Sequence, residues 1–171
     1  MKKMIRLAVV AGAVVAVASA LAIAVRAEPA NHANRLEATF TESAQSITNR
    51  IADLGTFQLI NTGTGTVEGF GGATEVVGIT QDRSVSPCGA GSWTNAATRR
   101  IVLDGGVLEL FELGAACPTP SGPVIRGTYE VDGFSSTGVF AGARGSGDLT
   151  VDVAAHTATL SGRLNLAGSD G

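Results

Sequence analysis

Two carboxylates lie in stretches of the sequence that are typical of β-strands, where they could take part in acid–base chemistry or bind a polar ligand. Glu68 lies between Val67 and a Gly-Phe pair, and Glu109 lies in the run 107–113, VLELFEL. Alternate residues of a strand face the same side, so Glu109 shares its face with apolar residues and Glu112 faces the other way. Burial would raise the pKa of either carboxyl and suit it to proton transfer. The alternative is that both carboxylates are exposed to solvent and have no functional role, because charged residues are seldom fully buried.

Trp93 and Tyr129 are the aromatic residues that we expect to line a ligand pocket, with simple packing as the alternative for each. The sequence contains no recognisable catalytic set. Ser146 lies in Gly-Ser-Gly rather than in G-x-S-x-G, and an oriented histidine would have to be His32 or His156. The same shortage of ligands disfavours a metal site. We therefore expect no catalytic residues, no metal and no cofactor.

The first residues have the pattern of a secretory signal peptide. Lys2, Lys3 and Arg6 precede an uncharged apolar run over 7–25, and Val25-Arg26-Ala27 fits a small-x-small cleavage site. The run is also long enough to span a bilayer, so an uncleaved anchor is the alternative. We expect a signal peptide over 1–27, a flexible polar spacer over 28–35 and one domain over 36–171, in a protein that is secreted or held in the cell envelope.

Removal of the leader changes the charge of the chain. The residues after Ala27 contain eight Arg, no Lys and all fifteen Asp and Glu, a formal net charge of −7. Nucleic acid and anionic membranes bind clustered cations, so neither is an expected partner of the cleaved chain. The sequence does not define an oligomeric state.

Cys88 and Cys117 form an even pair in a chain with an export signal, which predicts a disulfide. Asp104-Gly105 between two β-rich runs predicts a two-residue hairpin turn. In that register Cys117 lies opposite Ser92, so the disulfide would join the loop that contains Cys88 to the open end of the hairpin.

Short apolar runs separated by glycine predict an all-β fold of about eight antiparallel strands. A closed barrel with a packed or small-ligand interior is the expected architecture, and a β-sandwich is the alternative. The segment 43–54 could instead form a helical turn, since Ile47, Ile51 and Leu54 are spaced by four and three. The expected strands cover 36–41, 56–61, 64–70, 74–81, 93–103, 107–113, 124–131, 148–153 and 157–166.

The segment 127–164 contains Gly133-Phe134 followed by the glycine-rich run 137–147, TGVFAGARGSG. This run resembles the G-x-F-x-G-A-x-G-x-G stretch of the allene oxide cyclase and dirigent-like barrels, and of uncharacterised secreted bacterial proteins similar to them. The earlier run 63–74 is in keeping with the same group. The resemblance implies an eight-stranded antiparallel barrel with a central cavity, in which Phe140 could close one end. No residue of this chain is matched to a catalytic residue of that family.

Three functions follow from these features. The first is a secreted barrel that binds a small apolar molecule or a partner in its cavity. The second is a cofactor-free isomerase or cyclase of the allene oxide cyclase type, and the third is a structural module of the cell envelope. A cavity of about 300 Å³ or more, with apolar walls and one or two buried polar groups, would favour the first two, and a packed interior would favour the third.

Overall fold

The computed structural model describes residues 35–51 and 55–168. The expected signal peptide, and the expected spacer apart from Arg35, lie outside these residues. The strands are β1 (Leu36–Ile51), β2 (Thr56–Val67), β3 (Gly71–Asp82), β4 (Trp93–Leu103), β5 (Gly106–Thr119), β6 (Gly122–Val131), β7 (Thr137–Gly138), β8 (Ser146–Asp152) and β9 (Thr157–Gly162). Within the described ranges, no helix has the length and apolar character needed to cross a bilayer.

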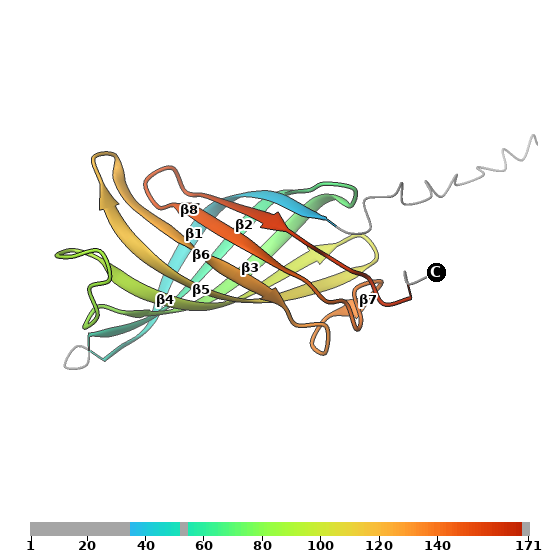
Figure 1. The fold of residues 1–171 in the computed structure, drawn as a ribbon, viewed down its shortest axis with the longest axis horizontal. Helices are drawn as coiled ribbons and strands as arrows, with labels where there is room; N and C mark the ends of the chain where they lie inside the picture. The colour runs from blue at the N-terminus through green and yellow to red at the C-terminus, as the bar shows by residue number, and fades with distance from the viewer. Residues whose placement is uncertain (1–34, 52–54, 169–171) are drawn as a thin grey trace, which may run out of the picture.

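The strands form one antiparallel sheet that closes on itself (Figure 1). Neighbouring strands pair from β1 through β6, β6 pairs with β8 and β8 with β9. The ring is completed where β9 pairs with β1, from Leu36 opposite Gly162 to Thr41 opposite Thr157. The two-residue β7 only adds a short pairing to β5. The fold is therefore the expected closed eight-stranded barrel rather than a sandwich.

The β4–β5 hairpin has the register that the sequence predicts. Leu103 lies opposite Gly106 across the Asp104-Gly105 turn, and Trp93 lies opposite Ala116 at the other end of the hairpin. Gly105 has a φ of 101°, a left-handed backbone conformation that glycine adopts readily in a tight turn. The predicted disulfide joins Cys88 to Cys117, with 5.6 Å between their Cα atoms.

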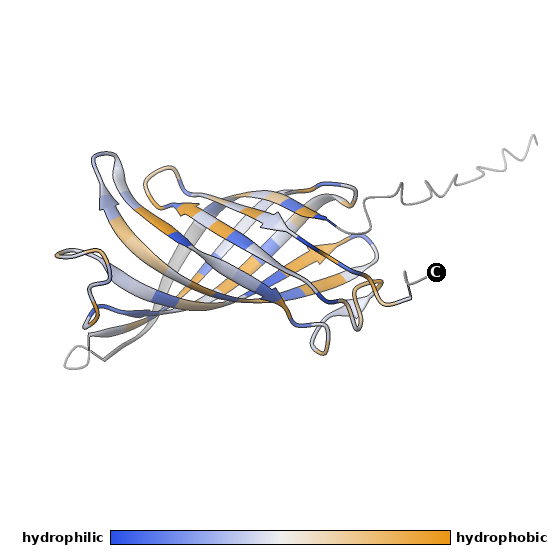
Figure 2. Cartoon of the chain, viewed as in Figure 1, coloured by the Kyte–Doolittle hydropathy of each residue, from blue (hydrophilic) through white to orange (hydrophobic). Residues whose placement is uncertain are grey.

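Apolar and polar side chains alternate along the strands, as the colours of Figure 2 show. The inward apolar residues fill one end of the barrel, and the core there includes Phe40, Leu108 and Leu160. Phe140, from the glycine-rich run, is fully buried and closes this end against Phe70, with 5.1 Å between the ring centroids. The expectation that Phe140 plugs one end is confirmed.

The segment 43–54, for which the sequence left helix and strand open, is a strand as far as Ile51: β1 continues to that residue with register shifts at Glu42/Ala44 and Ile47/Asn49, and 52–54 lie outside the described residues. One local prediction is wrong. The expected strands 56–61 and 64–70 are one strand, β2, that pairs with β3 from Thr56 to Val67. The glycines that suggested a break lie inside it: a Cβ at Gly63 would come within 2.7 Å of the Glu75 carboxylate, so this glycine leaves space for a neighbouring side chain.

The two ends of the barrel differ in what they carry (Figure 1). The connections β3–β4, β5–β6 and β8–β9 lie at one end, together with the end of β1 and the start of β2, and we call this the open end. The described chain starts at Arg35 and stops at Gly168 at the opposite end, together with the β6–β8 connection that contains Phe140. We call this the plugged end.

Candidate functional site

A cavity of about 130 Å³ enters the barrel from the open end. Its apolar walls come from β3, β4, β6 and β8, and Leu149, Val151 and Val153 all contribute, as their predicted common face requires. Trp93 and Gln81 lie at the ends of β4 and β3 nearest the mouth. Polar side chains that line the cavity more deeply include Glu42, Asn61, Arg99 and Glu112.

Arg99 of β4 occupies the centre of a charged cluster inside the barrel. Its Nε donates to Glu112 at 2.5 Å, its Nη2 donates to the same carboxylate at 3.4 Å, and its Nη1 donates to Glu75. Glu42 lies 3.6 Å from Nη1. The guanidinium is 1% exposed and sits 5.9 Å from the centre of the Phe40 ring, where the cavity meets the apolar core. Three carboxylates thus surround one cation, with a formal charge of −2 when all are ionised.

The groups of this cluster differ in how firmly they hold their charge. Burial opposes the charge of Arg99, but Glu112 and Glu75 outweigh it and raise the pKa of Arg99 above its ordinary value. Burial raises the pKa of Glu75 to about 7, against the attraction of Arg99 and with the repulsion of Glu42 and Glu112. One oxygen of Glu75, Oε1, has no hydrogen-bond partner. Glu75 therefore takes up a proton near neutral pH.

The raised pKa of Glu75 predicts a fall in stability with rising pH. The folded chain holds this proton up to about pH 7, whereas the unfolded chain releases it near pH 4.5. The stabilisation is therefore complete below the lower value and is lost as pH rises through the higher one, by up to about 3 kcal/mol. Urea unfolding of the wild type and Glu75→Gln, followed by fluorescence between about pH 5 and about pH 8, measures the difference.

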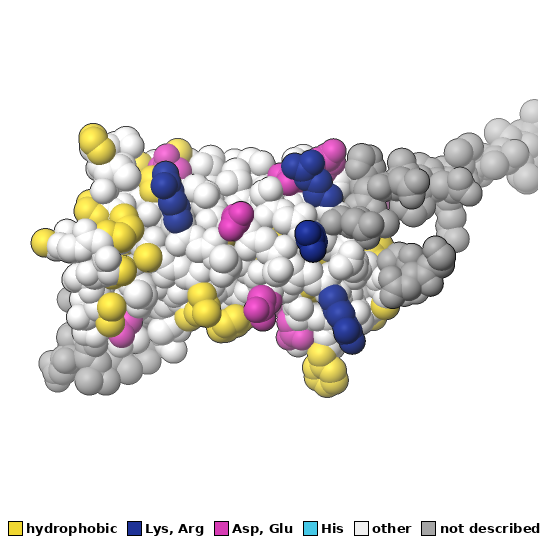
Figure 3. All heavy atoms as spheres, in the orientation of Figure 1, with side chains coloured by type: hydrophobic (Ala, Val, Ile, Leu, Met, Phe, Trp, Pro, Cys, Tyr) yellow, Lys and Arg dark blue, Asp and Glu magenta, His cyan; other side chains and the backbone are white. Residues whose placement is uncertain are grey.

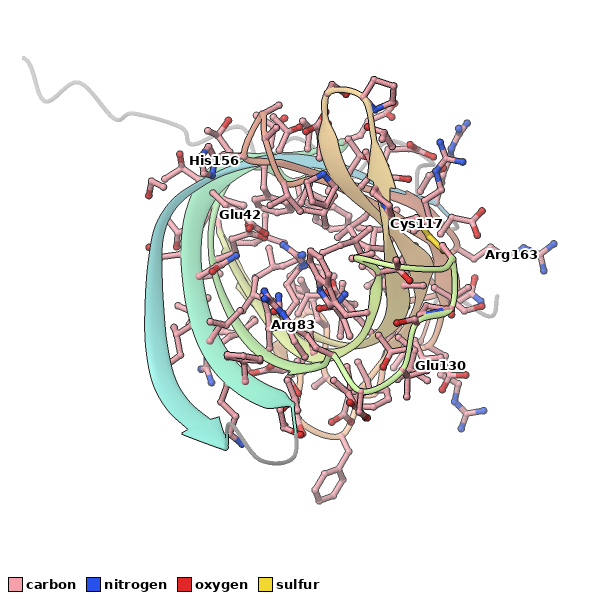
Figure 4. All side chains as sticks on the ribbon, turned by 90° about the vertical axis from the view of Figure 1, so that its left-hand side faces the viewer. Glu42, Arg83, Cys117, Glu130, His156 and Arg163 are labelled. Atoms are coloured by element: carbon pink, nitrogen blue, oxygen red, sulfur yellow. A yellow bond between two sulfur atoms is a disulfide. The ribbon has the colours of Figure 1, made fainter. Side chains whose placement is uncertain are left out.

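The matched control is Glu130→Gln, which changes an exposed carboxylate on the outside of the barrel (Figure 4). We expect Glu75→Gln to flatten the pH dependence of the free energy of unfolding and Glu130→Gln to leave it as in the wild type. Equal slopes for wild type and Glu75→Gln would show that Glu75 is ionised throughout this range.

Two amide side chains at the cavity have polar atoms without partners. Asn61 donates from Nδ2 to Glu42 at 2.5 Å, but its Oδ1 accepts no hydrogen bond. Asn95 is unpaired at both Oδ1 and Nδ2, and Trp93 is unpaired at Nε1. Asn61 and Asn95 are each only 8% exposed. Buried polar groups normally have partners, so these atoms mark positions where a ligand or water completes the hydrogen bonding.

The mouth is bordered by aromatic side chains and a loop held by the disulfide. The Arg83 guanidinium lies 4.7 Å from the Phe57 ring centre and 4.9 Å from that of Trp93. Figure 4 looks into this end, with Glu42 and Arg83 inside the ring of strands, Cys117 at its edge and Glu130 and Arg163 outside. On the face drawn in Figure 3, many of the hydrophobic side chains gather at the open end, whereas acidic and basic side chains lie singly or in small mixed groups along the barrel wall.

The residues proposed from the sequence lie in four different settings. Trp93 lines the cavity. Tyr129 is 1% exposed within the apolar core; burial raises its pKa to about 12, and its hydroxyl lies over Gly147 and Gly162 without a hydrogen-bond partner. Glu68 is exposed in the β2–β3 turn at the plugged end. These three residues therefore do not form one site.

Glu109 lies on the outer side of the barrel, beneath the β6–β7 connection. Its backbone N–H donates to Ser136 Oγ at 3.0 Å, and its carboxylate pairs with Arg100 at 3.1 Å. Burial raises the pKa of Glu109, and Arg100 opposes the shift. Glu112, which the sequence placed on the other face of β5, is the carboxylate that lines the cavity. The signal that distinguishes them is the hairpin register, since it sets Glu112 opposite Ala97 on the inner face and Glu109 opposite Arg100 on the outer face.

Sequence reasoning did not identify Glu42, Asn61, Glu75, Asn95 or Arg99. They come from four strands and meet only when the sheet closes. Within the described ranges, no group of three His, Cys, Asp or Glu side chains is arranged to hold a metal ion. No protein-family model matches the chain, and no curated protein is similar to it in sequence.

Proposed function

We propose that this chain is a secreted β-barrel protein that binds a small organic molecule in the cavity at its open end. The observation that carries the proposal is the set of buried, unpaired polar atoms on Asn61, Asn95 and Trp93 between apolar walls. Pockets that bind small molecules combine a mostly apolar lining with a few fixed polar groups. The disulfide supports secretion, because such bonds persist in oxidising compartments.

The size of the cavity limits the ligand. Its volume of about 130 Å³ is below the roughly 300 Å³ typical of pockets for drug-sized molecules. Since one ordered water occupies about 10–15 Å³ on the same measure, the cavity holds a molecule of about ten non-hydrogen atoms. The volume is also below the roughly 300 Å³ that would favour binding or cyclisation on size alone, but the open end of the barrel is not packed as the interior of a purely structural module would be.

Binding accounts for the geometry better than catalysis does. A cyclase or isomerase of the allene oxide cyclase type needs a group that exchanges a proton with the ligand. Glu75 has a suitable pKa of about 7, but it does not line the cavity. Glu42 and Glu112 do line it, and their carboxylates are held by Asn61 and Arg99. These two carboxylates are better placed as fixed hydrogen-bond acceptors.

The experiment fills the cavity from within. Ala97 of β4 is buried and lines the cavity, so Ala97→Phe places a ring in the ligand's position. The chain has one tryptophan, Trp93, and its place in the lining makes its fluorescence a direct readout. We expect benzylamine or benzyl alcohol to give a saturable change in the wild type with a Kd at or below about 1 mM, and no change in Ala97→Phe.

Thr98→Phe is the matched control, because Thr98 is the next residue on β4 and is exposed on the outer face. This variant should bind as the wild type does, and circular dichroism should show that both variants are folded. Equal binding by wild type and Ala97→Phe, or no saturable change in the wild type with benzylamine, benzyl alcohol or benzoate, would refute the proposal.

A further inference from the structure

The unpaired polar atoms on residues that line the cavity are two donors, Nδ2 of Asn95 and Nε1 of Trp93, and two acceptors that can take N–H or O–H donors of a ligand. Oδ1 of Asn61 and Oδ1 of Asn95 are acceptors without a donor, and both residues are more than nine-tenths buried. The carboxylates of Glu42 and Glu112 line the same space. Acceptors therefore dominate the deeper part of the cavity, where Asn61 and Glu42 are joined by a hydrogen bond.

The charges around the cavity disfavour an anion. Arg99 is the one cation among the lining residues, and its nitrogens already donate to Glu112 and Glu75. An anionic ligand would therefore meet Glu42 and Glu112 without a free guanidinium to compensate. At the rim, the Arg83 guanidinium donates to Gln81 and lies over the rings of Phe57 and Trp93, whereas the carboxylate of Asp152 lines the cavity itself. The exposed His156 also borders the mouth.

We propose that the ligand is a small organic cation, a protonated amine attached to a compact apolar body. The ammonium group would lie between the Glu42 carboxylate and Asn61 Oδ1, which supply the acceptors that an ammonium requires. The apolar body would contact Ile79, Ile125 and Val151 toward the mouth. This assignment depends on the proposed function, since it specifies the chemistry of the ligand that the same cavity binds.

The test compares three probes with the same ring: benzylamine, benzyl alcohol and benzoate. Trp93 fluorescence at about neutral pH gives each Kd. We expect benzylamine to bind at least about tenfold more tightly than benzyl alcohol, because a charge-assisted hydrogen bond is stronger than a neutral one. We expect benzoate to bind more weakly than either.

Glu42→Gln is the decisive variant. It removes the charge and leaves an amide oxygen that can still accept the hydrogen bond from Asn61, while Arg99 keeps Glu75 and Glu112. Benzylamine affinity should fall by about tenfold and benzyl alcohol affinity should stay within about twofold. Glu130→Gln makes the same change of charge on the outer wall and should leave both affinities unchanged.

The outcomes separate this inference from the proposed function. Benzyl alcohol or benzoate binding as tightly as benzylamine, or benzylamine affinity that is unchanged in Glu42→Gln, would overturn the cation assignment. If Ala97→Phe nevertheless abolishes the binding of whichever probes bind the wild type, the cavity remains a small-molecule site for a neutral or anionic ligand. Failure of all three probes to bind the wild type would refute both proposals.

Discussion

Replacement of Arg99 by leucine is expected to lower the free energy of unfolding by about 3–5 kcal/mol. The change removes the only cation that contacts Glu42, Glu75 and Glu112 among the described residues, so three carboxylates remain in the interior without compensation. The loss should be larger at about pH 8 than at about pH 5, because protonation relieves the repulsion among the carboxylates. Urea unfolding at both pH values measures it.

The adjacent residue provides the control for this prediction. Arg100 follows Arg99 on β4 but points outward, and its side chain is 56% exposed where it pairs with Glu109. Arg100→Leu should cost less than about 1 kcal/mol, as exposed ion pairs do. If Arg99→Leu cost no more than Arg100→Leu at about pH 8, the cluster would contribute no net stability to the barrel.

Removal of the disulfide through a Cys88→Ala/Cys117→Ala double substitution is expected to cost about 3–4 kcal/mol. The bond closes a loop with a sequence separation of 29 residues. Its loss raises the conformational entropy of the unfolded chain and thereby lowers the free energy of unfolding. It also releases the β3–β4 connection from the end of β5. Chemical denaturation of both proteins, with and without dithiothreitol, measures the difference.

The reductant distinguishes the effect of losing the disulfide from any effect of the two alanine substitutions themselves. Dithiothreitol should lower the stability of the wild type to about that of the double variant and leave the variant unaffected. Equal stability of wild type and variant without the reductant would contradict the expected contribution of the bond.

The β4–β5 hairpin shows what can be predicted from local sequence. An Asp-Gly turn fixes the register of the strands on either side, and the pairings from Leu103–Gly106 to Trp93–Ala116 follow from it by counting. The same register predicted where Cys117 would lie. The alternation of Leu149, Val151 and Val153 likewise placed β8 correctly. Features set by neighbouring residues were thus accessible before the structure.

The two faces of β5 explain why the sequence favoured Glu109 rather than Glu112 as the ligand-binding carboxylate. Large apolar residues occupy both faces of VLELFEL: Leu108 and Leu110 are buried inside, while Phe111 and Leu113 remain about half exposed outside. Periodicity alone therefore did not identify the inner face. The alternation of β4 resolves the ambiguity, because the buried Ile101 lies opposite Leu108.

The glycines of β2 show a feature that counting residues from a turn could not predict. Gly63 accommodates the Glu75 carboxylate, and a Cβ at Gly65 would come within 2.7 Å of the Phe40 ring. In each case the side chain that needs the space comes from another strand. In the sequence alone, these glycines therefore suggested that the strand ends between 61 and 64. The charged cluster has the same origin, since Glu42, Glu75, Arg99 and Glu112 come from β1, β3, β4 and β5. The family resemblance implied a barrel with a cavity, and the relationship itself stays a prediction.

The position of the described chain ends at the plugged end has a practical consequence. Both Arg35 and Gly168 lie on the side of the barrel away from the cavity mouth. A barrel coupled to a sensor chip at either of these two positions would therefore present its mouth to the solution. Attachment at this end leaves the ligand's route of access unobstructed, whereas coupling through the β3–β4 loop would place the support across it.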